Sequence, residues 1–388
     1  MAKLNIPKPR LAMPERAKTL GVVFLLLVAM AAGFAGGLIG SRSQHNLNTS
    51  TTAQKQVVSS ESQLISSIAK DVGPSVVSIT VTSQTTQPNF FGYAQPVQQE
   101  SAGTGIILNS DGVIVTNRHV VPAGAGSVTV VLSDGTKLDK VDVIGRTSDS
   151  DSLDVAFLKI TDKKGKTLTP AKLGDSGKMQ VGDKVVAIGN ALGQFQNTVT
   201  SGIISGYGRS VVAGDESSSE NLQNLFQTDA AINQGNSGGP LVNTSSEVIG
   251  LNTAVAGDAQ NIGFAIPIID IKGLINSVLN TGKLQRPYLG VRYVSITDDY
   301  AYQYNLPVKR GAYIVPGEGA IVSGSPAEKA GLKEKDIITK INNTTIDENN
   351  SITSVLGRFN VGDSVTLTVL RDGKEQKITV KLESAPSS

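Results

Sequence analysis

One serine of the sequence lies in a glycine-rich turn that suits a nucleophile. Ser237 stands in the run Gly235-Asn236-Ser237-Gly238-Gly239-Pro240. The flanking glycines permit backbone angles that other residues adopt only with strain, and they let a substrate carbonyl approach closely. In such a turn the N–H groups of Gly235 and Ser237 can converge on one point, as an oxyanion hole requires. We therefore expect a nucleophile at Ser237 and an oxyanion hole over Gly235, Asn236 and Ser237, with a plain tight turn as the alternative.

A base for this serine is needed, because a serine hydroxyl is a weak nucleophile at neutral pH. The chain contains two histidines. His45 lies in a polar stretch just after an apolar N-terminal segment, which leaves His119 as the imidazole available to a folded domain. His119 follows an apolar run at Val115-Thr116-Asn117-Arg118. Taken alone, a histidine at a strand end is explained equally well by a structural or exposed position.

The acid that would orient this base is expected at Asp154, which interrupts the apolar run Leu153-Asp154-Val155-Ala156-Phe157-Leu158. A buried carboxylate is costly unless it is paired or well hydrogen-bonded. An imidazole that donates its Nδ1–H is such a partner, and the contact holds the base in its working tautomer. An exposed aspartate at a strand edge is the alternative interpretation. Asp149 and Asp151, in the neighbouring Ser/Asp loop, are alternative candidates for the acid.

Composition excludes several other classes of chemistry. The 388 residues contain no Cys, which removes thiol catalysis and disulfides, and two histidines without Cys cannot form the usual zinc sites. No metal and no cofactor is therefore expected. The formal net charge of +2 gives no electrostatic footprint for nucleic acid. The 41 glycines, with few aromatic residues, favour β-rich domains with many tight turns.

The elements that must position these residues are short strands. From Val76 to about Pro267, apolar runs recur between Gly, Asp and Asn turn signals, a pattern typical of antiparallel barrels or sandwiches. Residues 83–101 and 210–221 are predicted as loops. A helix is predicted from about Ile269 to Thr281, ending at Gly282.

The N-terminal segment predicts a membrane helix. Basic residues precede an uncharged apolar stretch over residues 19–41, which is long enough to span a bilayer. The basic flank places the N-terminus in the cytoplasm and the rest of the chain outside. A cleavable signal peptide is the alternative, with Ala29-Met30-Ala31 as a cleavage site. The Ser, Thr, Asn and Gln-rich residues 42–60 are predicted to be a flexible tether, and Leu64, Ile65 and Ile68 to face one side of a short helix.

A separate α+β module follows the boundary at Gln285-Arg286-Pro287. Ser325-Pro326-Ala327-Glu328 is a capping box that begins a helix. Ile352, Val355 and Leu356 fall on one face of a second helix. Asp372-Gly373 marks a hairpin turn between two alternating runs. These signals predict a module that can fold by itself.

The catalytic segments resemble the HtrA (Deg) trypsin-like serine proteases. The resemblance rests on Thr116-Asn117-Arg118-His119-Val120-Val121, on Leu153-Asp154-Val155-Ala156, on the run from Gln227 to Pro240, and on Asn261-Ile262-Gly263-Phe264-Ala265-Ile266-Pro267. The order His119, Asp154, Ser237 is that of chymotrypsin. The resemblance implies a mainly β, chymotrypsin-like double β-barrel protease domain, followed by a PDZ domain. Arg118 is less usual before the histidine, and it is expected to alter access to the cleft.

The same resemblance assigns further residues. It implies that the PDZ loop Tyr288-Leu289-Gly290-Val291 captures the C-terminal carboxylate of a peptide, which adds as a strand beside the helix with Ile352. It maps the substrate pocket to Ile232, Asn252, Thr253 and Ala254, which predicts cleavage after small or medium aliphatic residues. Arg209 matches the start of a regulatory sensor loop. Lys335 replaces a glycine that is usual before Asp336. A homotrimer is implied as well.

These inferences divide the chain into a cytoplasmic N-terminus (1–18), a membrane anchor (19–41), a tether (42–60), a protease domain (61–283) and a PDZ domain (284–388). The expected function is peptide-bond hydrolysis in unfolded or regulatory extracytoplasmic proteins, as in protein quality control. The PDZ domain would recruit substrate or regulate activity. The alternatives are a membrane-tethered PDZ binding protein with an idle protease domain, and a chaperone with little proteolysis.

Overall fold

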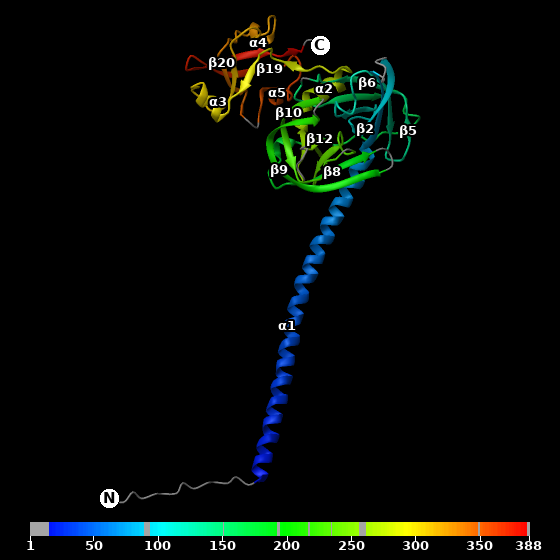
Figure 1. Ribbon diagram of the computed structural model, residues 1–388, viewed down its shortest axis with the longest axis vertical. Coiled ribbons are helices and arrows are strands. Elements are labelled where there is room, and N and C mark those ends of the chain that lie inside the picture. Colours follow the sequence, from blue (N-terminus) through cyan, green and yellow to red (C-terminus); the bar gives the residue numbers. More distant parts are fainter. Residues whose placement is uncertain are drawn as a thin grey trace, which may run out of the picture. The chain divides into compact units, whose positions relative to one another are not determined.

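The structure is a computed structural model in which the chain separates into two units, Met1–Leu64 and Ile65–Ser388. It describes residues 15–88, 94–149, 151–191, 195–215, 218–233, 235–255, 261–347 and 350–385 (Figure 1). The described part of the first unit is helical. The second contains a β domain and a C-terminal module, drawn from cyan to green and from yellow to red.

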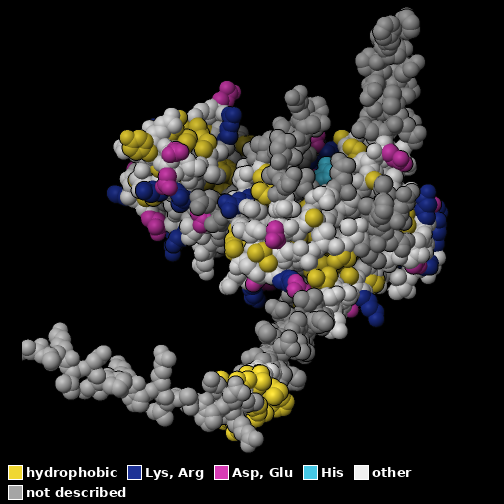
Figure 2. Space-filling model, turned by 60° about the horizontal axis from the view of Figure 1, so that its bottom comes forward, with side chains coloured by type: hydrophobic (Ala, Val, Ile, Leu, Met, Phe, Trp, Pro, Cys, Tyr) yellow, Lys and Arg dark blue, Asp and Glu magenta, His cyan; other side chains and the backbone are white. Residues whose placement is uncertain are grey.

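A single helix, α1 (Glu15–Val72), carries the apolar N-terminal segment. Its residues Leu20–Leu38 have a mean hydropathy of 2.3 and are long and apolar enough to cross a membrane, by length and composition. Their side chains are exposed, and they form the yellow group on the helix in Figure 2. The helix continues through residues 42–60, where the sequence predicted a flexible tether. No Gly or Pro interrupts the chain between Ser41 and Val72, so nothing in the sequence stops the helix there.

The first half of the β domain is a sheet whose strands pair in the order β5-β4-β1-β2-β3-β7-β6. Short helical turn η1 (Gly73–Ser75) leads into it. The strands are β1 (Val76–Pro88), β2 (Ala94–Ile107), β3 (Val113–Thr116), β4 (Ala125–Val131), β5 (Lys137–Leu138), β6 (Val141–Arg146) and β7 (Ala156–Ile160). Antiparallel β3 and β7 align Thr116 with Ala156, so the chain segments that follow β3 and precede β7 meet at one edge. His119 and Asp154 lie in those two segments.

The second half is a closed barrel in the order β10-β13-β12-β11-β8-β9. Its strands are β8 (Lys184–Ala191), β9 (Phe195–Asp215), β10 (Ser218–Thr228), β11 (Pro240–Asn243), β12 (Val248–Val255) and β13 (Gly263–Pro267). Turn η2 (Ser176–Lys178) precedes it, and η3 (Ile268–Ile271) with α2 (Lys272–Thr281) follows. Ser237 lies in the turn before β11. Helix α2 ends at Gly282, which has a φ of 68° as the sequence predicted for a helix stop.

Two segments predicted as loops are strands instead. Residues 83–88 and 94–101 extend the antiparallel pair β1 and β2, with Ser83 opposite Gln99. Residues 210–215 and 218–221 extend the pair β9 and β10, with Ser218 opposite Asp215. The loop predictions were wrong because polar Ser, Thr and Gln side chains are compatible with strands once a partner strand supplies the hydrogen bonds.

The C-terminal module has the elements that its sequence predicted. A sheet runs β15-β16-β17-β19-β20, β18 pairs with β17, and β14 pairs with β21. Glu328 N–H donates to the Ser325 hydroxyl at the start of α4, and α5 places Ile352, Val355 and Leu356 in the core. The elements are β14 (Pro287–Tyr288), β15 (Tyr293–Ser295), α3 (Asp298–Gln303), β16 (Ala312–Ile314), α4 (Pro326–Lys329), β17 (Ile337–Ile341), β18 (Thr344–Thr345), α5 (Ile352–Leu356), β19 (Ser364–Arg371), β20 (Lys374–Lys381) and β21 (Glu383–Ser384).

Two turns of this module have left-handed backbone. Asp372 and Gly373, between β19 and β20, have φ of 49° and 75°, the geometry of the predicted hairpin turn. Lys335 has a φ of 67°. This backbone explains why glycine is the usual residue at that position of the family pattern.

A buried polar cluster joins the C-terminal module to the β domain. Asp270 in η3 is 1% exposed and accepts hydrogen bonds from Asn224 Nδ2 (2.5 Å) and Arg358 Nε (3.3 Å). Asn224 Nδ2 also lies 2.7 Å from the hydroxyl of Ser354 in α5. Burial raises the pKa of the Asp270 carboxyl, although Arg358, Ser354 and Asn224 act in the opposite direction.

This cluster makes stability depend on pH through Asp270. Because its folded-state pKa is raised, the folded state favours the protonated carboxyl, and the carboxyl's contribution to stability falls as pH rises from the unfolded pKa (about 3.9) through the higher folded pKa. We expect the free energy of unfolding of Asp270→Asn, minus that of wild type, to increase from pH 4 to pH 7. Urea unfolding at several pH values measures this difference. A difference that does not change with pH would contradict the assignment.

Candidate active site

The two segments that meet beside β3 and β7 bring His119 and Asp154 into direct contact. His119 Nδ1 lies 2.7 Å from Asp154 Oδ2, and the His119 backbone N–H donates to Asp154 Oδ1 at 3.0 Å. The Asn117 side-chain amide donates to the Asp154 backbone carbonyl at 3.0 Å. The imidazole is 42% exposed whereas the Asp154 side chain is 1% exposed. The ring can therefore meet a substrate on one side while the carboxylate fixes it from behind.

The Asp154 carboxylate is stabilised in its ionised form. Burial acts to raise the pKa of Asp154, but the hydrogen bond and charge of the His119 ring, with the Thr253 hydroxyl and the His119 backbone N–H, outweigh it and hold that pKa below its usual range. Thr253 Oγ1 donates to Asp154 Oδ2 at 2.7 Å. An ionised carboxylate at this position favours the tautomer with the proton on Nδ1, so that Nε2 carries the lone pair that accepts a proton.

Thr104, which sequence reasoning missed, links the serine turn to the first sheet. Its N–H donates to Ser237 O at 2.9 Å, and its hydroxyl donates to Gly235 O at 2.6 Å. Its carbonyl accepts a hydrogen bond from Thr116 Oγ1 at 2.7 Å, in the strand that leads to His119. The signal available in the sequence was a threonine between two glycines, Gly103 and Gly105. Through Thr104 the serine turn and the histidine strand are held by one residue.

The serine turn is shaped by left-handed glycines and by three asparagines. Gly235 and Gly238 have φ of 123° and 81°. Asn236 N–H donates to Asn233 O at 3.1 Å, so this N–H serves the turn itself, while the N–H groups of Gly235 and Ser237 are the expected oxyanion donors. Asn252 accepts a hydrogen bond from Gly238 N–H at 2.8 Å and donates its own N–H to Gly239 O at 2.9 Å. The barrel strand β12 therefore holds the serine turn through backbone hydrogen bonds.

The residues predicted to form the substrate pocket have structural contacts. Ile232, Asn252 and Thr253 are 2%, 0% and 4% exposed. Ile232 packs in the core of the barrel, Asn252 supports the serine turn, and Thr253 holds Asp154. Ala254 lies in β12, and its side chain is outside the described residues. The assignment of these residues to a substrate pocket stays a prediction.

Substitution at Gly238 is expected to disrupt the turn. A Cβ there would overlap the Thr104 carbonyl oxygen and the Thr116 hydroxyl, in addition to the strain of a positive φ. We expect Gly238→Ala to lower kcat/KM by at least ~100-fold, because displacements of about 1 Å in an active site have effects of that size. Gly165→Ala is the matched control, since Gly165 has a φ of 76° and no described atom within 4 Å of the added Cβ. Peptide turnover and thermal unfolding are measured for both variants. Equal losses of kcat/KM in Gly238→Ala and Gly165→Ala would contradict the prediction.

Arg209, predicted to begin a regulatory loop, lies on β9. Its Nε donates to Gln227 Oε1 on the neighbouring strand β10 at 3.0 Å. The side chain therefore joins two barrel strands at the surface. A regulatory role for Arg209 stays a prediction.

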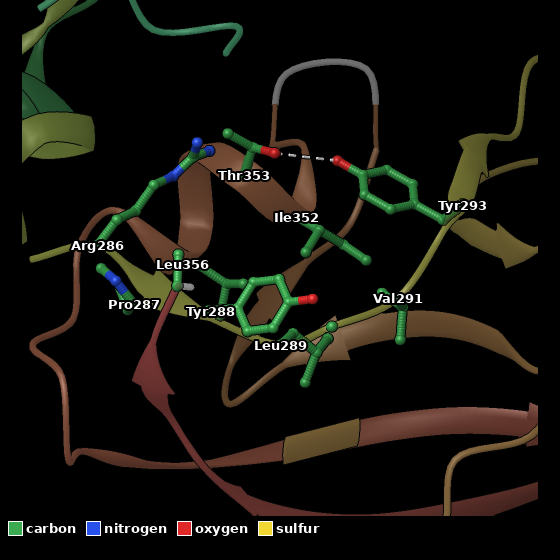
Figure 3. Close-up of a pocket in the computed structure, with 11 residues that line it drawn as sticks. Arg286, Pro287, Tyr288, Leu289, Val291, Tyr293, Ile352, Thr353 and Leu356 are labelled. Carbon is green, nitrogen blue, oxygen red and sulfur yellow. Dashed lines mark hydrogen bonds between the residues drawn. The ribbon is translucent and has the colours of Figure 1, made fainter. Parts of the chain in front are cut away.

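The C-terminal module contains a groove of about 440 Å³ between the loop at Leu289 and helix α5. Figure 3 shows Ile352 and Leu356 of α5 on one side, and Tyr288, Leu289 and Val291 on the other. Tyr293 and Thr353 hydrogen-bond across it through their hydroxyls, 3.2 Å apart. Gly290 has a φ of 83°, and an added Cβ would overlap Ser325. The loop residues predicted from the sequence therefore line the groove together with Ile352 and Leu356 of the predicted face of α5.

Comparison with known proteins identifies both parts of the second unit. The family model for a trypsin-like peptidase domain matches residues 103–251, and that for a PDZ domain matches residues 287–382. The chain is 38% identical to the serine protease Do-like HtrA of Bacillus subtilis, covering 84% of this chain and 74% of the relative. It is 34% identical to the periplasmic serine endoprotease DegP of Escherichia coli, covering 97% and 80%.

A solved structure shows the same fold. The HtrA-type protease AlgW with decapeptide superposes with a TM-score of 0.60 at 29% identity, covering 84% of this chain and 99% of that chain. The β domain is thus a trypsin-like protease domain, and the C-terminal module is a PDZ domain. With both domains matched along most of its length to curated serine proteases, the chain belongs to the HtrA family of serine proteases.

Proposed function

We propose that this serine protease cleaves peptide bonds through an acyl-enzyme formed on Ser237. The proposal rests chiefly on the 2.7 Å contact between His119 Nδ1 and the buried Asp154. His119 takes the proton of the Ser237 hydroxyl through Nε2 as the oxygen attacks the substrate carbonyl, and then gives it to the leaving amine. A water molecule then attacks the acyl-enzyme with the same help from His119, which releases the second product and restores the Ser237 hydroxyl. Asp154 orients the ring and stabilises the imidazolium that forms in each half of the reaction.

The negative charge on the substrate oxygen is stabilised by the N–H groups of Gly235 and Ser237 in this mechanism. Donors of this kind contribute about 3–4 kcal/mol each to transition-state stabilisation. The left-handed backbone at Gly235 and the bonds from Thr104 to Gly235 O and Ser237 O support this role. The Thr104 bonds hold the peptide units that follow Gly235 and Ser237, and a bond from Gly239 N–H to Asn236 O at 2.9 Å holds the unit that carries the Ser237 N–H.

Substrates of this activity are proposed to be unfolded or regulatory proteins outside the cytoplasm. A relative, DegP, is named a periplasmic endoprotease. The pocket predicted around Ile232 and β12 carries no acidic side chain among its named residues, so cleavage after small or medium aliphatic residues is favoured over cleavage after Arg or Lys. A peptide library in which Arg or Lys is preferred would contradict this specificity.

The groove of the PDZ domain is proposed to bind the C-terminus of a peptide. The loop at Gly290 presents backbone N–H groups to a carboxylate, and the peptide adds as a strand facing Ile352 and Leu356. The related AlgW structure was determined with a decapeptide. Peptide bound there would recruit substrate or regulate the protease domain, with the β9–β10 strand pair at Arg209 as the proposed sensor.

The apolar part of α1 is proposed to anchor the protein as a single membrane span, with the catalytic domain outside the cytoplasm. A signal sequence satisfies the same length and composition. N-terminal sequencing of the mature protein from membrane fractions distinguishes them, because a cleaved signal removes the residues before the new terminus. A homotrimer is proposed from the family resemblance, and light scattering of the purified protein tests it.

The test of the proposed function combines turnover and covalent labelling. The full chain, purified in detergent, is incubated with casein, with and without peptides that have apolar C-termini. A fluorophosphonate probe is added in parallel and its site is located by mass spectrometry. We expect casein fragments and a single adduct on Ser237. Intact casein and unlabelled Ser237, even with peptides present, would refute the proposal.

The same experiment separates the two alternatives. A PDZ binding protein with an idle protease domain would bind the peptides without labelling at Ser237. A chaperone with little proteolysis would prevent aggregation of unfolded casein and leave it uncut. The intact His119, Asp154 and Ser237 set favours the enzyme over both.

A further inference from the structure

We propose that Arg118 is a positioning residue for this reaction, which holds the chain before Asp154 so that the carboxylate meets His119 correctly. Arg118 is completely buried, at 0% exposure. It therefore does not face the cleft, and the sequence prediction that it alters access to the cleft was wrong. Arg118 directly precedes His119 in the chain, so the residues that its guanidinium binds are linked to the catalytic base through the backbone.

The guanidinium binds carbonyls on the segment that leads to Asp154. Arg118 Nη1 donates to Leu153 O at 3.1 Å and to Asp151 O at 3.3 Å, and it also donates to Ser148 O. It lies 3.3 Å from the hydroxyl of Thr147, which itself donates to Leu153 O at 2.6 Å. One side chain thus fixes several points of this segment, including the residue directly before Asp154.

Three consecutive residues on the histidine side therefore hold neighbouring points on the aspartate side. Asn117 binds the Asp154 carbonyl, Arg118 binds the Leu153 carbonyl, and His119 binds the Asp154 carboxylate through its N–H and its ring. The first two contacts fix the backbone, and the third depends on where that backbone places the carboxylate. Without the guanidinium, buried carbonyls lose their donor, and the segment must rearrange to find others.

A second feature shows that this segment is held from outside as well. The Asp151 side chain is 2% exposed, accepts a hydrogen bond from Leu153 N–H at 2.9 Å, and pairs with Arg286 at the start of the PDZ domain. A charged side chain is costly to bury unless acceptors and a counter-charge surround it. The carbonyls of this segment accept from Arg118 Nη1, and the Asp149 carboxylate lies 3.8 Å from Nε. Two nitrogens of the guanidinium therefore face different partners, which the single nitrogen of a lysine ammonium does not reproduce.

The inference rests on the proposed triad, and it predicts a specific kinetic pattern. In the full chain, Arg118→Met and Arg118→Lys should lower kcat for a peptide substrate by about 10- to 100-fold, with KM changed less than about twofold, since an interaction needed only for the chemical step is lost. Lysine should retain more activity than methionine. Lys166→Met is the control, because Lys166 is an exposed cation of the same domain that pairs with Asp134 at 2.7 Å, and its loss should leave kcat unchanged.

A double-mutant cycle with Asp154→Asn then distinguishes positioning from general stability. If Arg118 acts through Asp154, Arg118→Lys should cost much less in the Asp154→Asn background than in wild type. Equal losses in both backgrounds, an unchanged kcat, or a rise in KM that accounts for the loss would each overturn the inference. Should Arg118→Met fail to fold, the lysine variant and its cycle decide alone. A wild-type chain without turnover refutes the proposed function, whereas turnover that is insensitive to Arg118 refutes only this inference.

Discussion

Replacing Ser237 with alanine is expected to lower kcat by about 10⁶-fold, the size of loss measured when a triad serine is removed. The variant keeps the oxyanion donors and the His119–Asp154 pair, so about 10³- to 10⁴-fold acceleration over water should remain. Hydrolysis of a peptide substrate by the full chain in detergent measures the loss. Because alanine lacks the hydroxyl oxygen that attacks phosphorus and displaces fluoride, the fluorophosphonate adduct should also disappear.

Two controls separate this effect from damage to the fold. Ser245→Ala changes an exposed serine in the turn between β11 and β12 and should leave turnover unchanged. Binding of a C-terminal peptide to the PDZ groove should be the same in wild type and Ser237→Ala. If the alanine variant still hydrolyses peptides at more than about one thousandth of the wild-type rate, Ser237 is not the nucleophile.

The contact between His119 and Asp154 could be predicted from the sequence because the candidates were few. Two histidines in the chain, one of them beside an apolar N-terminal segment, left His119. An aspartate inside an apolar run required a partner, and the structure pairs Asp154 with His119. The elements of the PDZ domain could be predicted for a similar reason, since its caps, its helix face and its hairpin turn are set by residues near each other in the chain.

Contacts between distant residues could not be predicted in this way. Thr253 was assigned to a substrate pocket, but it donates to Asp154, which lies 99 residues earlier. Thr104 joins the serine turn and the histidine strand only because the two halves of the domain pack together. Arg118 was expected to alter access to the cleft, but it is buried and binds backbone carbonyls of the segment before Asp154. Such partners leave no periodic or local pattern in the sequence.

Predictions of where strands and helices end were wrong where they rested on amino-acid composition. Polar residues 83–88 and 94–101 suggested a loop, yet they continue the pairing of β1 and β2. Residues 42–60 suggested a tether, yet α1 continues through them. In both segments the backbone forms regular hydrogen bonds, although few of the side chains are apolar. Apolar patterning predicts which side of an element is buried better than it predicts where an element ends.

The contacts of Asp154 lead to a second large effect. Asp154→Asn should lower kcat by about 10⁴-fold with little change in the geometry of the site. The asparagine oxygen can still accept the His119 backbone N–H, which now reaches Oδ1 at 3.0 Å. The amide nitrogen then donates to Nδ1 of the ring. This contact places the ring proton on Nε2, so Nε2 can no longer accept the proton of the serine. The loss should therefore appear in kcat, with KM nearly constant.

Thr253→Val and Asp149→Asn test whether this loss belongs to the buried carboxylate. Thr253→Val removes one hydrogen bond to Asp154 Oδ2 and leaves the ion pair, so a smaller loss of about 10-fold is expected. Asp149, the alternative acid considered from the sequence, has a side chain that is 75% exposed and pairs with Arg146. Asp149→Asn should leave kcat unchanged. Because Asp154 contacts the His119 ring at 2.7 Å, a large loss in Asp149→Asn with a small one in Asp154→Asn would reassign the acid.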